Sequence, residues 1–159
     1  MSSSKRKKTK EATVSLIIPC YNEASGVTES LDELRMVLQD RDDVEIIAVN
    51  DGSSDDTPAI LDDYAAQAPE MRVLHNDPNL GYGASLKHGI REARGEVIVI
   101  IDADGTYPAS VIPELLEKLA KCDMAVGARI GRNVNVPLVR RPAKWVLLRY
   151  ARWMARADI

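Results

Sequence analysis

Two aspartates, Asp102 and Asp104, stand one residue apart directly after the apolar run VIVII at residues 97–101. Five consecutive β-branched residues predict a central strand that is buried on both faces of a parallel sheet. Residues i and i+2 of an extended chain lie on the same side, so the two carboxylates are expected to converge. Carboxylates repel each other unless a cation or proton lies between them, and Mg²⁺ and Mn²⁺ prefer oxygen ligands. The spacing predicts a divalent-metal site that also holds substrate phosphates, with a solvated acidic turn as the alternative.

Polar side chains also follow two earlier apolar segments, at residues 14–19 and 45–49. Tyr21 and Glu23 come after the first, and Asp51 comes after the second. The carboxyl ends of parallel strands share one sheet edge, where open α/β sheets bind their ligands. Tyr21 offers a flat face for a base, and Asp51 offers an acceptor for a base N–H. Simple turn and helix-cap chemistry is the alternative, because NDGSSDDT is also a good turn sequence.

Strands and helices are expected to alternate along the chain. Predicted strands cover residues 14–19, 45–49, 72–75, 97–101 and 124–128, and predicted helices lie near residues 26–39, 57–68, 84–94 and 108–121. Thr57, followed by Pro58, is the expected N-cap of the second helix. This order, with short connections and right-handed crossovers, predicts an α/β fold: a Rossmann-like layered sheet of mostly parallel strands with helices on both faces.

Charge is distributed unevenly over the 159 residues, whose net charge is -3. Residues 1–10 carry five Lys or Arg and no acid, residues 11–128 carry 23 acids against eight bases, and residues 129–159 carry eight bases against one acid. An acidic body flanked by basic ends argues against a protein that binds nucleic acid over its whole surface. The two cysteines lack metal-type spacing, and without a signal-peptide pattern the expected location is the cytoplasm.

The two ends of the chain have their own expected roles. Residues 1–11 are predicted to be a disordered basic tail, and residues 132–159 a basic amphipathic segment. A helix with arginines on one side and Trp153 on the other lies at an anionic membrane surface in one interpretation. Packing of its apolar face against a further part of the domain explains the pattern equally well.

Five motifs carry a resemblance to a known family. VSLIIPCYNE, IIAVNDGSSDDT, NLGYGASLKHGI, GEVIVIIDADGTYP and DMAVGAR follow one another between residues 14 and 129. They resemble family 2 glycosyltransferases of the GT-A fold, and within them the dolichyl-phosphate mannose synthases and other polyprenyl-phosphate glycosyltransferases. The resemblance implies a metal-dependent, inverting hexosyltransferase that moves a sugar from a nucleotide-diphosphate donor to a polyprenyl or dolichyl phosphate. It also implies peripheral contact with the cytoplasmic membrane surface, and residues 12–131 as the nucleotide-sugar-binding domain.

The resemblance further implies which residues bind the nucleoside. Pro19, Tyr21 and Glu23 match the positions that line it, and Asp51 matches the position that reads the base. Val49 belongs to the same nucleotide-sugar-binding set. By contrast, the GYG at residues 81–83 lacks the spacing of dinucleotide-binding and P-loop motifs, which weakens both of those alternatives.

The sugar-diphosphate side is implied in the same way. Asp102, Ala103 and Asp104 match the positions that contact the sugar-diphosphate, with the two acids on Mg²⁺ or Mn²⁺. Arg129 matches an element that faces phosphate, donor or lipid. Thr106 departs from the mannose-type pattern, in which Gln is often an extra metal ligand, and leaves the sugar open.

Two points stay open at this stage. Asn50 stands where the family often has an acid, so the base of the donor is not fixed. The acid that lies near the acceptor in the family belongs to a segment expected beyond Ile159, so no catalytic base is assigned within the chain. The alternatives are a donor-binding fragment without activity, a transferase to a saccharide acceptor, and a nucleotidyltransferase, although CYNEASG lacks the basic residues that the last would need.

Overall fold

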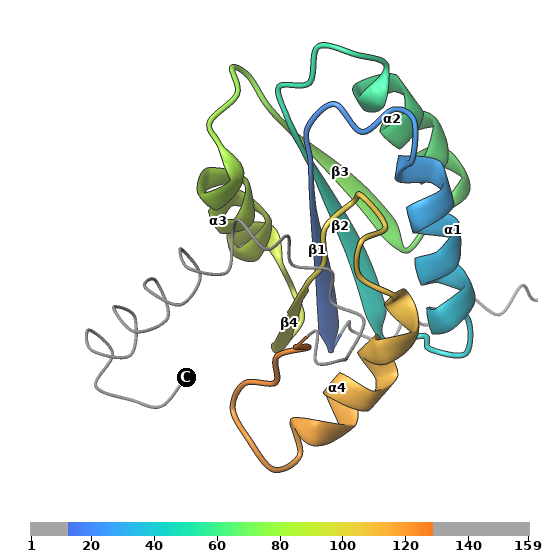
Figure 1. Ribbon diagram of the computed structural model, residues 1–159, viewed down its shortest axis with the longest axis vertical. Coiled ribbons are helices and arrows are strands. Elements are labelled where there is room, and N and C mark those ends of the chain that lie inside the picture. The colour runs from blue at the N-terminus through green and yellow to red at the C-terminus, as the bar shows by residue number, and fades with distance from the viewer. Residues whose placement is uncertain (1–12, 129–159) are drawn as a thin grey trace, which may run out of the picture. The chain divides into compact units, whose positions relative to one another are not determined.

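The computed structural model describes residues 13–128, and every structural statement below refers to that range. The chain divides into two compact units, Met1–Glu114 and Leu115–Ile159. The first unit holds the β-sheet and the candidate site (Figure 1). The predicted basic tail at residues 1–11, the amphipathic segment at residues 132–159 and Arg129 lie outside the described residues.

The sheet has four parallel strands, β1 (Val14–Cys20), β2 (Val44–Asp51), β3 (Met71–Asn76) and β4 (Val97–Ile100). Their order across the sheet is β3-β2-β1-β4. Because all pairings are parallel, the carboxyl ends of the strands lie at one edge, and the loops that leave them are neighbours. The predicted α/β sheet is confirmed.

Helices cover both faces of this sheet, as predicted. The helices are α1 (Val27–Leu38), α2 (Thr57–Gln67), α3 (Tyr82–Glu92) and α4 (Ile112–Lys118), with a short 3-10 turn, η1 (Ala109–Val111), before α4. In Figure 1, α1 and α2 lie on one side of the strands and α3 on the other. The α2 helix begins at Thr57, so the N-cap position belongs to Asp56 and the expected cap at Thr57 is wrong.

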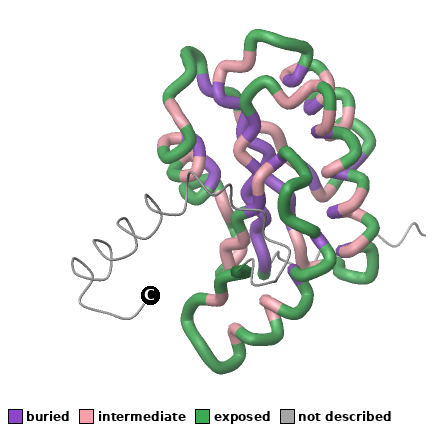
Figure 2. The backbone as a smooth tube through the Cα atoms, viewed as in Figure 1, coloured by how far each residue is buried: buried purple, intermediate pink, exposed green. Residues whose placement is uncertain are grey.

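Apolar burial follows the central strands and the inner faces of the helices, shown in purple in Figure 2. The apolar residues of α1 recur at helical spacing and all four are buried: Val27, Leu31, Leu34 and Leu38. On the other face, α3 lies so close that a Cβ at Gly89 would stand 2.6 Å from Ile17 Cγ2. This close approach places α3 directly on β1 and β2, beside the edge that carries the site.

Two expectations about strands are wrong. β4 is not central: it forms the edge of the described sheet, pairs only with β1 there, and leaves Ile100 46% exposed. An apolar run alone cannot separate a central strand from an edge strand, because the order of strands is set by the crossovers. Residues 124–128 form no strand in the structure, and Met124 is 77% exposed. A strand needs a hydrogen-bonded neighbour, which local sequence does not reveal.

No helix within residues 13–128 combines the length and the apolar character that crossing a bilayer requires.

Candidate functional site

A cavity of about 440 Å³ lies at the carboxyl ends of β1, β2 and β4. Seven of the nine predicted site residues line it: Pro19, Tyr21, Glu23, Asp51, Asp102, Ala103 and Asp104. These residues are up to 85 positions apart in the sequence, and the shared edge of the parallel sheet brings them together.

The two remaining predicted residues do not contribute to the described cavity. Val49 is fully buried, in a core cluster with Ile17 and Ile47, and a Cβ at Gly89 of α3 would lie 3.2 Å from its Cγ2. Val49 shares a side of β2 with Asp51 but lies two residues further from the carboxyl end, so its side chain packs under α3 and does not line the cavity. Arg129 lies outside the described residues, so its role stays a prediction.

The loop after β1 is held by the loop after β2. Asn22 adopts a left-handed conformation with φ of 56°, and its Oδ1 accepts from the Ser54 backbone N–H at 2.8 Å. The backbone N–H of Glu23 donates to Thr57 Oγ1 at 2.8 Å. Thr57 is fully buried, so its hydroxyl is a fixed acceptor for the Glu23 backbone. This hydrogen bond, and not the predicted N-cap role, accounts for a threonine at position 57. Tyr21 stays 52% exposed, so the face of its ring is open to a ligand.

Besides lining the cavity, the Asp51 carboxylate binds Asn76 at the end of β3 and the loop before α3. Its Oδ1 accepts from Asn76 Nδ2 at 2.8 Å and from the Leu80 backbone N–H at 3.0 Å, while Oδ2 accepts from the Gly81 N–H at 2.8 Å. Burial alone would raise the pKa of Asp51, but these hydrogen bonds outweigh it and hold the pKa below its usual value. The ionised carboxylate therefore fixes the loop before α3 at neutral pH.

Asn50, where the family often has an acid, belongs to the turn that follows β2. Its Oδ1 accepts from the Ser53 backbone N–H at 3.2 Å, and its Nδ2 lies 3.1 Å from His75 Nδ1. It is buried and does not line the cavity. Having Asn and not an acid at position 50 therefore does not alter the described lining of the cavity.

The acidic loop after β4 is fixed to β1 and α1. The Ile101 backbone N–H donates to the Ile17 carbonyl at 3.2 Å, and Ser30 Oγ of α1 donates to the Ala103 carbonyl at 2.7 Å. Ala103 is buried, while Asp102 on one side of it is half-buried and Asp104 on the other is exposed. The sequence reading that both acids reach one site is consistent with this arrangement, since both line the same cavity.

Each of the two aspartates has a hydroxyl partner. Thr106 donates both its backbone N–H, at 2.9 Å, and its hydroxyl to Asp104 Oδ1. Thr106 thus orients Asp104. The Tyr82 hydroxyl, from the first residue of α3, donates to Asp102 Oδ1 at 3.0 Å.

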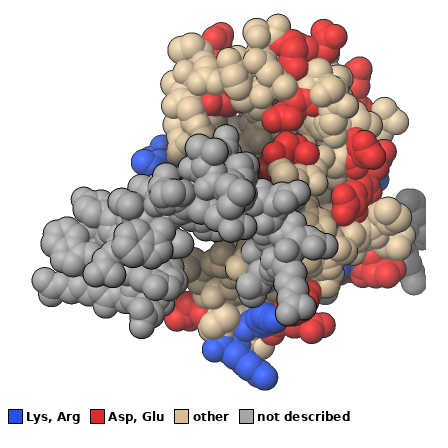
Figure 3. Space-filling view, in the orientation of Figure 1, with Lys and Arg blue, Asp and Glu red and all other residues tan. Residues whose placement is uncertain are grey.

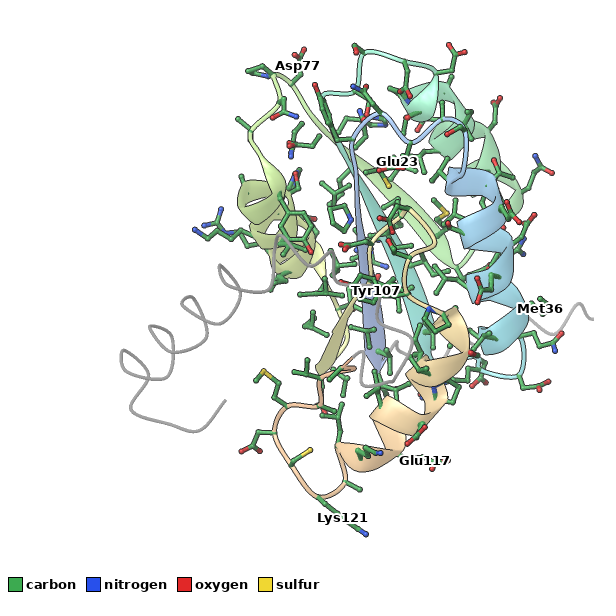
Figure 4. The ribbon with its side chains drawn as sticks, viewed as in Figure 1. Glu23, Met36, Asp77, Tyr107, Glu117 and Lys121 are labelled. Atoms are coloured by element: carbon green, nitrogen blue, oxygen red, sulfur yellow. The ribbon has the colours of Figure 1, made fainter. Side chains whose placement is uncertain are left out.

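Negative charge dominates the cavity. Its described lining contains four carboxylates, Glu23, Asp51, Asp102 and Asp104, and no Lys or Arg. Figure 4 labels Glu23 in the connection between β1 and α1, and Figure 3 shows many of the Asp and Glu side chains spread over α1 and α2. Burial raises the pKa of Glu23, and the neighbouring Asp104, Asp55 and Asp102 raise it further by repulsion. These carboxylates repel an anionic ligand such as a diphosphate, and a cation between them would offset that repulsion.

The donor set fits a hard divalent cation that is shared with a phosphate ligand. Within residues 13–128, no cluster of three or more His, Cys, Asp or Glu is arranged to hold a metal alone. Mg²⁺ in phosphate sites is commonly held by one or two carboxylates, with phosphate oxygens and water completing the shell. Asp102 and Asp104 supply the two carboxylates that such a site needs.

Comparison with known proteins gives this site its context. The model of the family described as "Glycosyl transferase family 2" matches residues 15–157. The chain belongs to glycosyl transferase family 2. It is 37% identical to the dolichyl-phosphate beta-glucosyltransferase ALG5C of Trichomonas vaginalis over 115 residues, which cover 69% of this chain and 34% of that protein. It is 34% identical to the undecaprenyl-phosphate mannosyltransferase of Micrococcus luteus over 144 residues, 87% of this chain and 58% of that protein.

Solved structures agree with the family assignment. The mannosyltransferase PcManGT from Pyrobaculum calidifontis, in complex with GDP-Man and Mn²⁺, matches with a TM-score of 0.63 and 31% identity over 70% of this chain and 33% of that one. TarS from S. aureus, in complex with UDP-GlcNAc, has a TM-score of 0.62 at 22% identity, a likeness of fold over 79% of this chain and 37% of that one. This family 2 chain spans between a third and three fifths of the length of the first relatives it matches.

The sequence reading missed part of the cavity lining. Asn79, Gly81, Tyr82 and Ser85 all line it, and they come from the loop after β3 and the start of α3. The signal is in NLGYGAS, because it follows the predicted strand at residues 72–75, and that strand is β3, the neighbour of β2 in the sheet. It was set aside because its glycine spacing matches no phosphate-binding motif.

Proposed function

We propose that this family 2 domain binds a nucleotide-sugar through a divalent cation and transfers the sugar to a polyprenyl phosphate. One observation carries the proposal: Tyr21, Asp51 and the Asp102–Asp104 pair line one cavity at the carboxyl edge of the sheet. An aromatic face for a base, an acceptor for a base N–H and a pair of metal-type carboxylates together match the parts of a nucleoside diphosphate sugar. Mg²⁺ and Mn²⁺ are both suitable cations for such oxygen ligands.

The nucleoside would lie toward the β1 and β2 loops. The exposed ring of Tyr21 provides a stacking surface, and Asp51 stays ionised and able to accept from a base. Pro19 and Glu23 complete this side of the cavity. The base and the sugar remain open within the proposal, because relatives include both glucosyl and mannosyl transferases.

The diphosphate would lie beside Asp102 and Asp104. A bound divalent cation there would neutralise the charge that develops on the departing nucleoside diphosphate, a contribution of several kcal/mol in metal-assisted reactions. The chain's own part is to hold the acids in place: Ser30 fixes the backbone between them, and Thr106 orients Asp104. Arg129 is proposed to assist at the phosphate, donor or lipid.

The acceptor is proposed from the relatives. Several matched proteins are named for transfer to dolichyl, undecaprenyl or bactoprenol carriers. A phosphate acceptor is already anionic at neutral pH, so it asks less of a general base than a sugar hydroxyl does. Such an acceptor places the domain at the cytoplasmic membrane surface, where it meets the lipid headgroup.

The test is donor binding measured by calorimetry with UDP-glucose and GDP-mannose, each with Mn²⁺ and with EDTA. We expect binding of at least one donor with Mn²⁺, and loss of at least tenfold in affinity with EDTA or in Asp104→Asn, because one of two carboxylate ligands is removed. Asp63→Asn, an exposed acid on α2 outside the cavity, is the matched control and should bind like the wild type.

Unchanged affinity in Asp104→Asn, or binding that ignores EDTA, would contradict the metal-dependent site. Transfer is then measured with undecaprenyl phosphate in detergent, using the donor that binds. Binding without transfer or donor hydrolysis would support the alternative of a donor-binding module. Transfer to a saccharide but not to the lipid phosphate would replace the proposed acceptor.

A further inference from the structure

Tyr82 joins the metal side of the cavity to the nucleoside side. Its hydroxyl donates to Asp102 Oδ1 at 3.0 Å across 20 positions of sequence. Among residues 13–128, the structure gives the Asp102 carboxylate no other hydrogen-bond donor. Tyr82 also lines the cavity and is 56% exposed, so its ring and hydroxyl lie at the site itself.

The place of Tyr82 is fixed by the residue before it. Gly81 has φ of +88°, a backbone conformation that side chains rarely adopt, and its N–H donates to Asp51 Oδ2 at 2.8 Å. The Gly81 carbonyl then accepts from the Ser85 N–H at 3.1 Å as α3 begins. Asp51 thus anchors the start of the helix from which Tyr82 reaches Asp102.

The hydroxyl is suited to hold an ionised carboxylate. A tyrosine hydroxyl is protonated at neutral pH, so it can donate to the ionised carboxylate of Asp102. A donor on one carboxylate oxygen restricts rotation of the group and leaves its other oxygen for a cation. Partners of this kind commonly set the orientation of metal-binding side chains.

We propose that Tyr82 is a positioning residue for the divalent cation, acting through its hydrogen bond to Asp102. The inference rests on the proposed function, because it assumes that Asp102 binds the metal. It adds a residue that the motif-based reading left out. The aromatic ring has a separate possible contact with the nucleotide, and a change that removes only the hydroxyl separates the two roles.

The experiment measures Mn²⁺ binding by EPR in the presence of the nucleoside diphosphate of the donor that binds, which supplies the phosphate oxygens but no sugar to transfer. Tyr82→Phe keeps the ring and removes the hydroxyl, and we expect Mn²⁺ affinity to fall about three- to tenfold. Loss of a hydrogen-bond partner of a metal ligand typically lowers metal affinity roughly 10–100-fold. We expect a smaller loss here, because water can replace the Tyr82 hydroxyl at a half-exposed site. Donor affinity measured with EDTA should not change, since the ring is retained.

The matched control is Tyr64→Phe. Tyr64 also donates to an aspartate, Asp32 Oδ1, at 2.7 Å, but this pair joins α2 to α1 outside the cavity. Removing the same kind of bond there should leave Mn²⁺ affinity within twofold of the wild type. Urea unfolding of both variants separates a general loss of stability from a local effect on the metal.

Asp102→Asn separates a failure of the proposed metal site from a failure of the positioning role of Tyr82. If Asp102→Asn leaves Mn²⁺ affinity unchanged, the proposed metal site fails, whatever Tyr82 does. If Asp102→Asn weakens Mn²⁺ but Tyr82→Phe does not, the positioning inference is overturned and the proposed function stands. The inference also requires that Tyr82→Phe add less than twofold when Asp102 is already Asn, because its effect passes through that side chain.

Discussion

At the scale of single residues, the cavity holds its acids close enough to disturb one another. Glu23 is the clearest case, because burial raises its pKa and three neighbouring aspartates raise it further. Its backbone N–H is fixed by the buried Thr57 hydroxyl, so the side chain cannot move far from the other acids. Repulsion of this kind costs folding free energy in the metal-free protein and favours a bound cation.

Glu23→Gln should therefore have opposite effects on two measurements. Without metal, removing one negative charge should raise the free energy of unfolding by about 0.5 kcal/mol, a small value because solvent screens this half-buried group. Mn²⁺ affinity should fall about two- to threefold, as expected for the loss of one nearby charge in well-solvated surroundings.

Urea unfolding in EDTA and EPR titration with Mn²⁺ provide the two readings, with Glu96→Gln, an exposed residue before β4, as the control. A metal-free protein that becomes less stable in Glu23→Gln would show that Glu23 has a favourable partner and is not under repulsion.

Residue identity alone predicted much of the site. Tyr21, Asp51, Asp102 and Asp104 follow predicted strands, and the shared edge of the sheet makes them neighbours. The family's motif implies Val49 as a site residue, but its place two residues below the end of β2 buries its side chain under α3. Tyr82 was not assigned, because its link to Asp102 depends on how α3 starts, and short-range patterns do not encode that contact.

At the scale of elements, a buried carboxylate joins strands and helix at the end of the sheet away from the cavity. Glu45 of β2 accepts from Ser15 Oγ of β1 at 2.6 Å and from the Arg94 backbone N–H, just after α3, at 2.6 Å. Arg72 of β3 donates to its other oxygen at 3.1 Å. Burial would raise the pKa of Glu45, but these donors outweigh it and lower the pKa below the ordinary 4.5.

Glu45→Gln should lower the free energy of unfolding at neutral pH by about 1–2 kcal/mol, since hydrogen bonds to a charged group are lost. A carboxylate with a lowered folded pKa stabilises the fold above its unfolded pKa, and this contribution disappears as the pH falls through the folded pKa. The difference between wild type and Glu45→Gln should therefore shrink below pH 4.5. Urea unfolding from neutral to acidic pH measures it, and a constant difference would contradict the ionised network.

Helices and strands were predictable where the apolar pattern was long. The predictions failed where the pairing of strands determines the structure. The four leucine and valine positions of α1 and the apolar strands β1 and β2 were predictable from spacing alone. β4 was expected in the centre because its residues are apolar, yet the structure places it at the edge of the described sheet. Residues 124–128 are also mostly apolar, but they form no strand, since strand formation requires a partner that local sequence does not reveal.

At the scale of the whole molecule, the site exists only because distant loops meet at one edge. Residues from three connections and from the end of β2 line the cavity. Each connection is held by a different residue: Thr57 holds the one after β1, Asp51 the loop before α3, and Ser30 the acidic loop. The described lining brings four carboxylates and no base to this edge. The central claim of the proposed function is that a cation offsets this charge when a phosphate ligand binds.

The most direct measurement is electron–nuclear double resonance of Mn²⁺ in a frozen ternary mixture of protein, Mn²⁺ and the donor that binds. The account predicts a ³¹P hyperfine coupling of the size seen when a phosphate oxygen coordinates the metal, present in the wild type and in Asp63→Asn and absent in Asp104→Asn. Protein-bound Mn²⁺ without ³¹P coupling, while the donor is bound, would contradict the claim that one cation bridges these acids to the diphosphate.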